Sequence, residues 1–284
     1  MKKHLITAVT LLTVGLIAGC GSGGTSTTAT TNTPTTSISG KVADGYLAGA
    51  TVFMDKNGNY QLDAGEPSAT TDANGSYTLM NVDPADVGKY PIVAMVVKGV
   101  TKDLDTNATV TSSYVLSMPA AAISGTVNSN FISPMSSQLR VLMDTGNYAS
   151  MQDAMSALST QLGMPVGTNM LTDYMVANNT AMHTTAQNMA SLMGSQMSQV
   201  LGASGSTTTV DAGRYQGMMM SIFKNMSSIK GTTPSAQSTM TNLMGTMTTT
   251  LQNTPSGMPF RNISTAIRGM MGGKGSSVTG GMMR

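Results

Sequence analysis

A run of twelve residues places oxygen-bearing side chains at a regular spacing. With Asp55 as position 1, positions 1, 3, 5, 9 and 12 are Asp55, Asn57, Asn59, Asp63 and Glu66, and the carbonyl of Gln61 is available at position 7. Calcium takes about six to eight hard oxygen ligands, and a carboxylate at the last position can bind the ion through both oxygens. The spacing therefore predicts a structural calcium site.

The same run has the ligand spacing of an EF-hand loop, with one departure. Position 6 of such a loop is usually glycine, but here it is Tyr60. Gly58 stands two residues earlier and offers another place for the chain to turn. The alternative interpretation is a solvated turn, rich in Asp and Asn, that holds no ion.

Short β-rich runs separated by turn residues extend from residue 38 to about residue 118. The runs cover residues 38–42, 50–54, 76–80, 90–97 and 109–118. The pairs Asp44-Gly45, Asn57-Gly58, Asn74-Gly75 and Val87-Gly88 suit turns because they tolerate positive φ. Polar and apolar residues alternate in the third run, so Tyr77 and Leu79 should share a buried face. This pattern predicts an all-β sandwich over residues 38–125.

Residues 49–79 contain the twelve-residue run and a second turn, Asp72-Ala-Asn74-Gly75-Ser-Tyr77. In these features the stretch resembles SdrD B-like and carboxypeptidase regulatory-like modules. The resemblance implies a prealbumin-like (Ig-like) β-sandwich whose loop holds structural calcium through Asp55, Asn57, Asn59, Asp63 and Glu66. It also implies a module that stiffens and spaces cell-surface proteins and is not an enzyme.

After residue 129 the sequence becomes rich in Met, Ala, Leu, Ser, Thr and Gln at helical spacing. Ser133-Pro134 is typical of a helix start, and Ser150 and Gly163 are suited to begin and end a second helix. A third helix carries Met175, Met182 and Met189 at heptad spacing, and two more are predicted over residues 212–229 and 234–252. The fold class predicted is therefore α+β with two domains, the sandwich followed by a Met-rich α-helical domain over residues 130–255. The Gly- and Met-rich residues 256–284 are predicted to be a flexible tail.

The first nineteen residues have the composition of a secretory signal. Lys2 and Lys3 precede an apolar run over residues 5–17, which is shorter than the roughly 20 residues that cross a bilayer. Ile17-Ala18-Gly19-Cys20 then resembles the lipobox of bacterial lipoproteins. The resemblance implies cleavage of residues 1–19, a thioether from Cys20 to diacylglycerol and an acyl chain such as palmitate on the new amino terminus. The alternative is a plain signal peptide followed by an incidental cysteine.

The residues after Cys20 suggest where the protein goes. Gly21 stands where lipoproteins retained in the inner membrane would have Asp, so the resemblance implies the outer membrane of a two-membrane bacterium, with the face left open. Residues 20–37 are rich in Gly, Ser and Thr and are predicted to be a flexible tether. Loss of residues 1–19 removes two of the 15 Lys and Arg and none of the 13 Asp and Glu, which leaves 13 of each. A neutral body with scattered charges excludes a nucleic-acid partner.

Methionine is unusually common, with 28 residues, 24 of them from Met118 onward. The helical spacing favours core packing, while the alternatives are an adaptable surface for an envelope protein partner or a copper-handling role, because thioethers bind Cu(I). A third alternative, polysaccharide binding, is disfavoured by the absence of Trp. Once His4 is removed His183 is the only imidazole, expected to be solvated, and Asp103 and Asp105 are expected to be ordinary loop acids. The sequence therefore predicts a lipid-anchored envelope protein with a structural or binding role and no enzymatic activity.

Overall fold

The described residues form two larger sheets and one small sheet. The computed structural model describes residues 34–125, 130–201 and 209–255. The first sheet has the order β10-β1-β5, with β1 Thr36–Val42, β5 Ser76–Val82 and β10 Asn130–Ile132. The second has the order β4-β3-β6-β9, with β3 Thr51–Met54, β4 Ser68–Thr70, β6 Ile92–Val96 and β9 Tyr114–Met118. The small sheet, β2-β7-β8, contains β2 Leu47–Ala48, β7 Lys102–Asp103 and β8 Ala108–Thr109.

The predicted strands are confirmed with small shifts. The run over residues 109–118 divides into β8 and β9, and β1 begins at Thr36, so the last two residues of the predicted tether belong to a strand. Tyr77 and Leu79 are buried together, as the alternation predicted. Strands β2, β4, β7 and β10 were not predicted, because two or three residues are too few to establish a period.

Among the described residues, five α-helices follow the strands, and most of their predicted boundaries are confirmed. They are α1 Pro134–Asp144, α2 Met151–Leu162, α3 Thr180–Val200, α4 Ala212–Ile229 and α5 Pro234–Gln252. Ser133 and Ser150 cap the first two helices through their side chains, and Gly163 ends the second with φ +65°. The two 3-10 turns, Pro84–Asp86 and Ala120–Ala122, lie in connections of the β part.

The third helix begins later than the heptad pattern predicted, and Met175 lies outside it. The side chain of Asp173 accepts hydrogen bonds from the backbone N–H groups of Met175 and Val176, which fixes a turn there. Asn178 then adopts φ +50°, and Asn179 caps the helix. Local side-chain bonds to the backbone therefore override the hydrophobic period.

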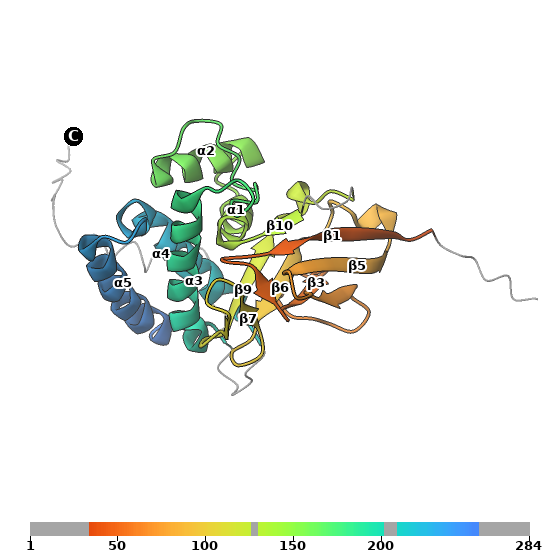
Figure 1. Cartoon of the computed structure of the whole chain (residues 1–284), viewed down its shortest axis with the longest axis horizontal. Coiled ribbons are helices and arrows are strands. Elements are labelled where there is room, and N and C mark those ends of the chain that lie inside the picture. The colour runs from red at the N-terminus through yellow and green to blue at the C-terminus, as the bar shows by residue number, and fades with distance from the viewer. Residues whose placement is uncertain (1–33, 126–129, 202–208, 256–284) are drawn as a thin grey trace, which may run out of the picture. The chain divides into compact units, whose positions relative to one another are not determined.

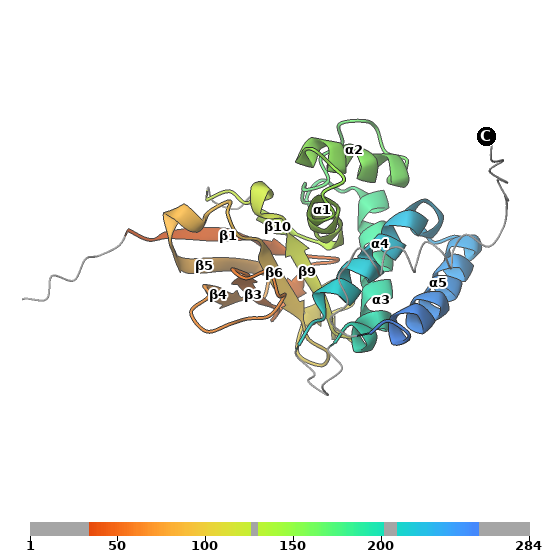
Figure 2. The same cartoon turned by 180° about the vertical axis from the view of Figure 1, so that it is seen from behind.

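Helix α1 lies at the centre of the fold, between the strands and the other helices (Figures 1 and 2). It contacts β9, β10, α2, α3 and α4. Every residue from Pro134 to Leu142 is buried, although several of these side chains are polar. Ser136 and Ser137 bond to the backbone of Ser117 on β9, at 2.7 and 2.8 Å. The helix is therefore joined to the sheet by hydrogen bonds as well as by apolar contact.

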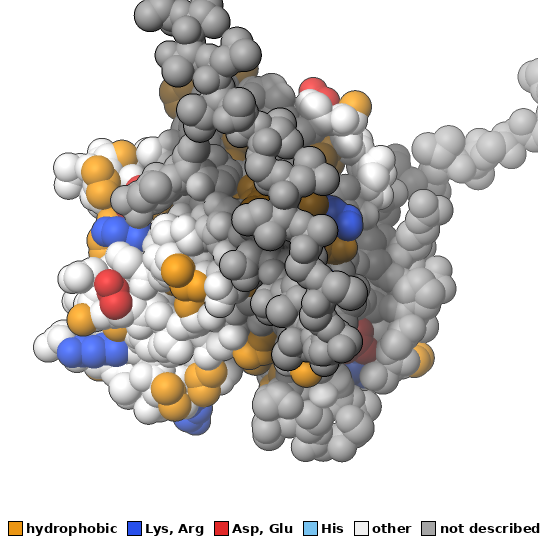
Figure 3. Space-filling view, turned by 90° about the vertical axis from the view of Figure 1, so that its right-hand side faces the viewer, with side chains coloured by type: hydrophobic (Ala, Val, Ile, Leu, Met, Phe, Trp, Pro, Cys, Tyr) orange, Lys and Arg blue, Asp and Glu red, His pale blue; other side chains and the backbone are white. Residues whose placement is uncertain are grey.

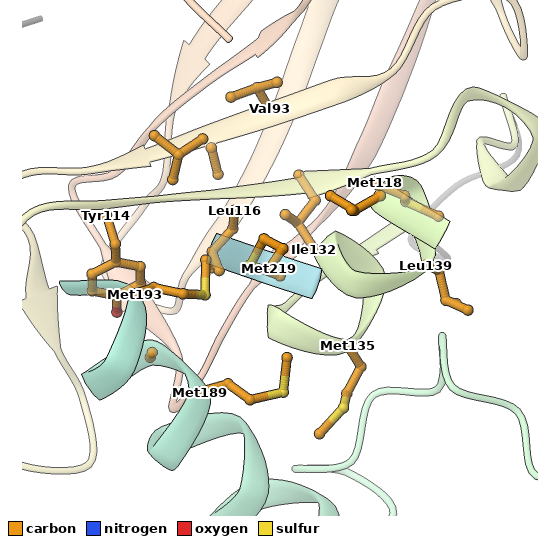
Figure 4. Packing of buried hydrophobic residues seen from close by; sticks show 14 of the residues in the cluster. Val93, Tyr114, Leu116, Met118, Ile132, Met135, Leu139, Met189, Met193 and Met219 are labelled. Carbon is orange, nitrogen blue, oxygen red and sulfur yellow. The ribbon is translucent and has the colours of Figure 1, made fainter. Parts of the chain in front are cut away.

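The hydrophobic core is continuous from the strands into the helices. Figure 4 shows Met189 and Met193 of α3 together with Leu116 of β9, Met219 of α4 and Met135 of α1. All five side chains are at most 1% exposed, so these methionines pack the core in the way that leucine would. The chain is thus a mixed α+β protein, and its core runs across the boundary predicted at residues 125–130.

The described residues include no helix that is both long and apolar enough to cross a membrane. The signal segment, Cys20, most of the predicted tether and the predicted tail lie outside the described residues. On the described part of the face in Figure 3, the few charged side chains stand apart from one another among uncharged ones.

Candidate metal centre

The twelve-residue run is the loop between strands β3 and β4. The two strands are antiparallel, with Phe53 opposite Ser68, and the N–H of Met54 donates to the carbonyl of Pro67 at 3.0 Å. Asp55 follows β3 directly, and Glu66 stands two residues before β4. The first and last predicted ligands are therefore brought to the same end of one hairpin.

The carboxylate of Asp55 is fully buried and accepts three hydrogen bonds. Oδ1 accepts from the N–H of Asn59 at 3.0 Å, and Oδ2 accepts from the N–H of Tyr60 at 3.2 Å. Oδ2 also accepts from Nη2 of Arg140 at 2.9 Å. Position 1 is therefore held rigidly by its own loop and by helix α1.

The side chains at positions 3, 5 and 9 are joined by hydrogen bonds. The amide groups of Asn57 and Asn59 both donate to Oδ2 of Asp63, at 2.7 and 2.8 Å. The amide oxygen of Asn59 accepts from the N–H of Gln61 at 2.7 Å, and that of Asn57 accepts from the N–H of Asn59 at 3.1 Å. Three of the predicted ligands thus converge on one point.

Glu66, the predicted ligand at position 12, joins the two ends of the loop. Oε1 accepts from the N–H of Lys56 at 2.7 Å, and Oε2 accepts from the N–H of Asp63 at 3.0 Å. Lys56 itself pairs with Asp86 at 2.7 Å. Both oxygens of Glu66 are therefore engaged with the backbone of the loop.

Tyr60 takes the left-handed conformation that glycine usually supplies at position 6, with φ +61°. Gly58 is left-handed as well, at φ +76°, so the turn expected there is also present. A non-glycine residue in this region costs about 1–2 kcal/mol. The ring of Tyr60 is 1% exposed and lies 4.6 Å from the ring of Tyr215, centroid to centroid, so its burial offsets the backbone strain.

Arg140 is the residue of this site that the sequence analysis missed. Its guanidinium is 3.9 Å from the centre of the Tyr60 ring, and its Nε is 3.7 Å from Asp144. Burial alone would lower the pKa of Arg140, but Tyr60, Asp55 and Asp144 raise it above its usual value, so the side chain stays charged. The sequence signal is an arginine placed between Leu139 and Val141 in a helix with several apolar residues.

The loop offers calcium mixed oxygen donors, not a cluster of acids. Among residues 34–125, 130–201 and 209–255, no three His, Cys, Asp or Glu side chains are grouped so that they could hold one ion. An ion here would need Asn57, Asn59 and the Gln61 carbonyl besides the carboxylates. Hard carboxylate, amide and carbonyl oxygens are the donors that calcium takes, so the residues present fit this ion.

Comparison with protein-family models, with curated proteins and with solved structures gives no match for this chain. The residues of the loop, the elements that hold it and the amino-terminal sequence are therefore the features that point to a function.

Proposed function

We propose that this protein is a lipid-anchored lipoprotein of the cell envelope, with a structural or binding role and no enzymatic activity. The body carries a prealbumin-like β-sandwich that calcium stabilises, followed by a Met-rich helical domain that meets an envelope partner. The observation that carries the calcium proposal is the convergence of Asn57, Asn59 and Asp63 beside Asp55 in a loop with a left-handed residue at position 6.

The ligands proposed are Asp55, Asn57, Asn59, Asp63 and Glu66 with the carbonyl of Gln61. Amide nitrogens face Asp63, while the amide oxygens accept from the N–H groups of Asn59 and Gln61. Binding calcium therefore requires the Asn57 and Asn59 amide groups to turn toward the ion and to give up these two backbone hydrogen bonds. Asp55 supplies a carboxylate of fixed orientation, because the backbone N–H of Tyr60 and the guanidinium of Arg140 both donate to its Oδ2. Bound calcium stabilises the folded state because the unfolded chain has no such site.

The anchor proposal rests on Ile17-Ala18-Gly19-Cys20 and on the neutral charge of the remaining chain. Two or more acyl chains at one residue hold a protein on a membrane without a spanning helix, at about 0.8 kcal/mol per buried methylene. The outer membrane is the destination that we propose, from Gly21 in place of Asp.

We propose that the sandwich and the helical domain share one hydrophobic core. Helix α1 joins the calcium-type loop through Arg140 and joins β9 through Ser136. This arrangement supports a rigid body in which the loop stabilises the helices as well as the strands.

The calcium proposal is tested by thermal unfolding of the full chain purified in detergent, with calcium and with chelator. We expect calcium to raise Tm, and Asp63→Ala to abolish the rise, because Asp63 is the exposed meeting point of the ligands. Asp83→Ala, which removes an acid outside the loop, should keep the rise. Equal Tm with calcium and chelator would overturn the proposal.

The anchor proposal is tested in cells that make the full chain. Incorporation of a labelled fatty acid and recovery in the membrane fraction are both expected for the natural chain. The Cys20→Ala variant should lose both, and a variant that stays in the membrane fraction would contradict the proposal.

A further inference from the structure

Two Asn-Gly pairs, Asn57-Gly58 and Asn74-Gly75, lie in turns of the β part, and both asparagines are exposed. Such a pair is chemically labile, because the backbone nitrogen of the glycine can attack the side-chain amide of the asparagine. Glycine has no side chain that would crowd this nitrogen. Whether the attack takes place then depends on the hydrogen bonds and the packing of the glycine, and in these the two pairs differ.

The backbone nitrogen of Gly58 is free to react. Gly58 is exposed, and within the described part of the chain its N–H donates no hydrogen bond. A Cβ at Gly58 would meet no atom within 4 Å, so the space around this residue is open. The nitrogen of Gly58 and the exposed amide of Asn57 are therefore both accessible.

The backbone of Gly75 is engaged on both sides. Its N–H donates to the carbonyl of Asp72 at 3.0 Å, and its carbonyl accepts from the N–H of Val42 at 2.9 Å. Gly75 is buried, and a Cβ there would lie 3.1 Å from the backbone nitrogen of Leu47. The nitrogen of Gly75 can reach the amide of Asn74 only if these hydrogen bonds break.

The amide of Asn57 is held between a donor and an acceptor. Its Oδ1 accepts from the backbone N–H of Asn59 at 3.1 Å, and its Nδ2 donates to Oδ2 of Asp63 at 2.7 Å. A donor at a carbonyl oxygen stabilises the negative charge that develops there when a nucleophile adds to the carbon. The N–H of Asn59 therefore favours attack by the nitrogen of Gly58.

We propose that Asn57 is a site of spontaneous deamidation. The nitrogen of Gly58 bonds to Cγ of Asn57 and gives up its proton, the bond from Cγ to Nδ2 breaks, and the departing amide nitrogen takes a proton and leaves as ammonia. The product is a five-membered succinimide ring. Water then adds to one ring carbonyl and breaks its bond to the nitrogen of Gly58. Addition at Cγ yields aspartate at position 57, and addition at the main-chain carbonyl yields isoaspartate.

The aspartate product changes position 3 of the calcium-type loop. It adds a fourth carboxylate to those of Asp55, Asp63 and Glu66. An oxygen replaces the amide nitrogen that donates to Asp63, so two negative oxygens face each other until a cation lies between them.

The exchange of amide for carboxylate favours calcium in two ways. A carboxylate presents oxygen at both positions, so it does not have to turn toward the ion as the amide of Asn57 does. The calcium affinity of such loops also depends on the number of charged ligands. Deamidation should therefore tighten calcium binding. This step rests on the calcium function proposed for the loop, whereas the deamidation itself does not.

The modification is tested by mass spectrometry of the full chain, purified in detergent and incubated at pH 8. Trypsin cleaves after Lys56 and Lys89, so one peptide contains both Asn-Gly pairs, and its fragmentation compares them within one molecule. Each deamidation adds about 1 Da. We expect Asn57 to convert at least tenfold faster than Asn74 in the folded chain, and the two to convert at similar rates in guanidinium chloride. Equal rates in the folded chain, or faster conversion of Asn74, would overturn the proposal.

Gly58→Ala provides a second measurement, since its methyl group crowds the attacking nitrogen. It should slow the conversion of Asn57 at least tenfold. The matched control is Gly65→Ala, because Gly65 is also exposed, left-handed and free of neighbours within 4 Å in the same loop. This control should change the rate less than threefold. Conversion of Asn57 at the natural rate in Gly58→Ala would show that Gly58 is not the nucleophile.

The calcium step is tested with Asn57→Asp, which has the structure of the aspartate product. Calcium is titrated calorimetrically into the full chain in detergent, and Asn74→Asp makes the same change of charge outside the loop. We expect Asn57→Asp to bind calcium about tenfold more tightly than the natural chain, and Asn74→Asp to differ less than threefold. Equal affinity of Asn57→Asp and the natural chain would overturn this step. If neither binds calcium, the calcium function fails as well, while the rates at Asn57 and Asn74 still decide the modification.

Discussion

Arg140 and Asp55 form an ion pair between the buried helix α1 and the calcium-type loop, with Nη2 of the arginine 2.9 Å from Oδ2 of the aspartate. The side chains are 4% and 0% exposed, and they lie 85 residues apart in the chain. Breaking a buried pair on one side leaves an uncompensated charge in the interior. The pair therefore makes the loop and the helical part depend on each other.

Arg140→Met should lower the free energy of unfolding by about 3–5 kcal/mol, because Asp55 then remains buried and unpaired. Arg140→Lys should lower it less, since it keeps the charge but loses the planar contact with Tyr60. Urea unfolding of the three chains measures the difference. Equal stability of the natural chain and Arg140→Met would show that the ion pair does not contribute to the free energy of unfolding.

Calcium should partly replace the missing charge in Arg140→Met. A calcium ion bound in the loop would neutralise the unpaired carboxylate of Asp55. The rise in Tm on adding calcium should therefore be larger in this variant than in the natural chain. Thermal scans with calcium and with chelator make the comparison. A smaller rise would mean that Arg140 is needed to position Asp55 as a ligand.

Tyr60 offers a separate test of backbone strain. Tyr60→Ala and Tyr60→Gly remove the same ring, but only glycine accepts φ +61° without a steric cost. We expect Tyr60→Gly to be about 1 kcal/mol more stable than Tyr60→Ala, and both to be less stable than the natural chain, which buries the ring. Chemical denaturation gives the order, and an alanine variant as stable as the glycine variant would contradict the interpretation.

The features predicted correctly from the sequence are those that depend on residues close together in the chain. Ser133, Ser150 and Gly163 mark helix ends through their own hydrogen bonds or φ angles, and these boundaries could be read from the residues alone. The oxygen spacing of residues 55–66 predicted a loop whose side chains meet, because the predicted ligands lie within twelve consecutive residues. Such features depend on neighbours a few residues away.

Long-range partners could not be predicted in the same way. Nothing in the spacing around Asp55 points to Arg140, and nothing around His183 points to Asp105, because both contacts require the tertiary fold. The expectation that Asp105 is an ordinary loop acid and His183 a solvated residue is therefore wrong, since the two bind one another. Strand β10 was missed for the same reason, since its three residues are defined by parallel pairing with β1. The lipid anchor at Cys20 and the bound calcium remain predictions.

Asp44 gives the stability a definite dependence on pH. Its pKa rises from 3.8 to about 7 on folding, so between these values the folded state binds more protons than the unfolded state. The contribution of this group to the free energy of unfolding should therefore be greatest below about pH 4 and should fall as pH rises to about 7, by on the order of 4 kcal/mol. In urea titrations at pH 5 and pH 8, Asp44→Asn should remove this decline. Asp103→Asn should keep most of it, because burial is the largest cause of the raised pKa of Asp44 and Asp103 a smaller one. An unchanged decline in Asp44→Asn would assign it to another group.

At Gly40 of β1 the neighbouring strand β10 approaches closely. A Cβ at Gly40 would lie 1.8 Å from the carbonyl oxygen of Asn130, its parallel partner on β10, so even alanine must push the two strands apart. We expect Gly40→Ala to lower the free energy of unfolding by at least 2 kcal/mol, because the move disturbs both β10 and the start of α1. The matched control is Gly245→Ala on α5, where a Cβ meets nothing within 4 Å and where alanine should stabilise the helix by up to about 1 kcal/mol. If Gly40→Ala unfolds at the same urea concentration as the natural chain, the close approach of β1 and β10 does not contribute to holding the strands and helices together.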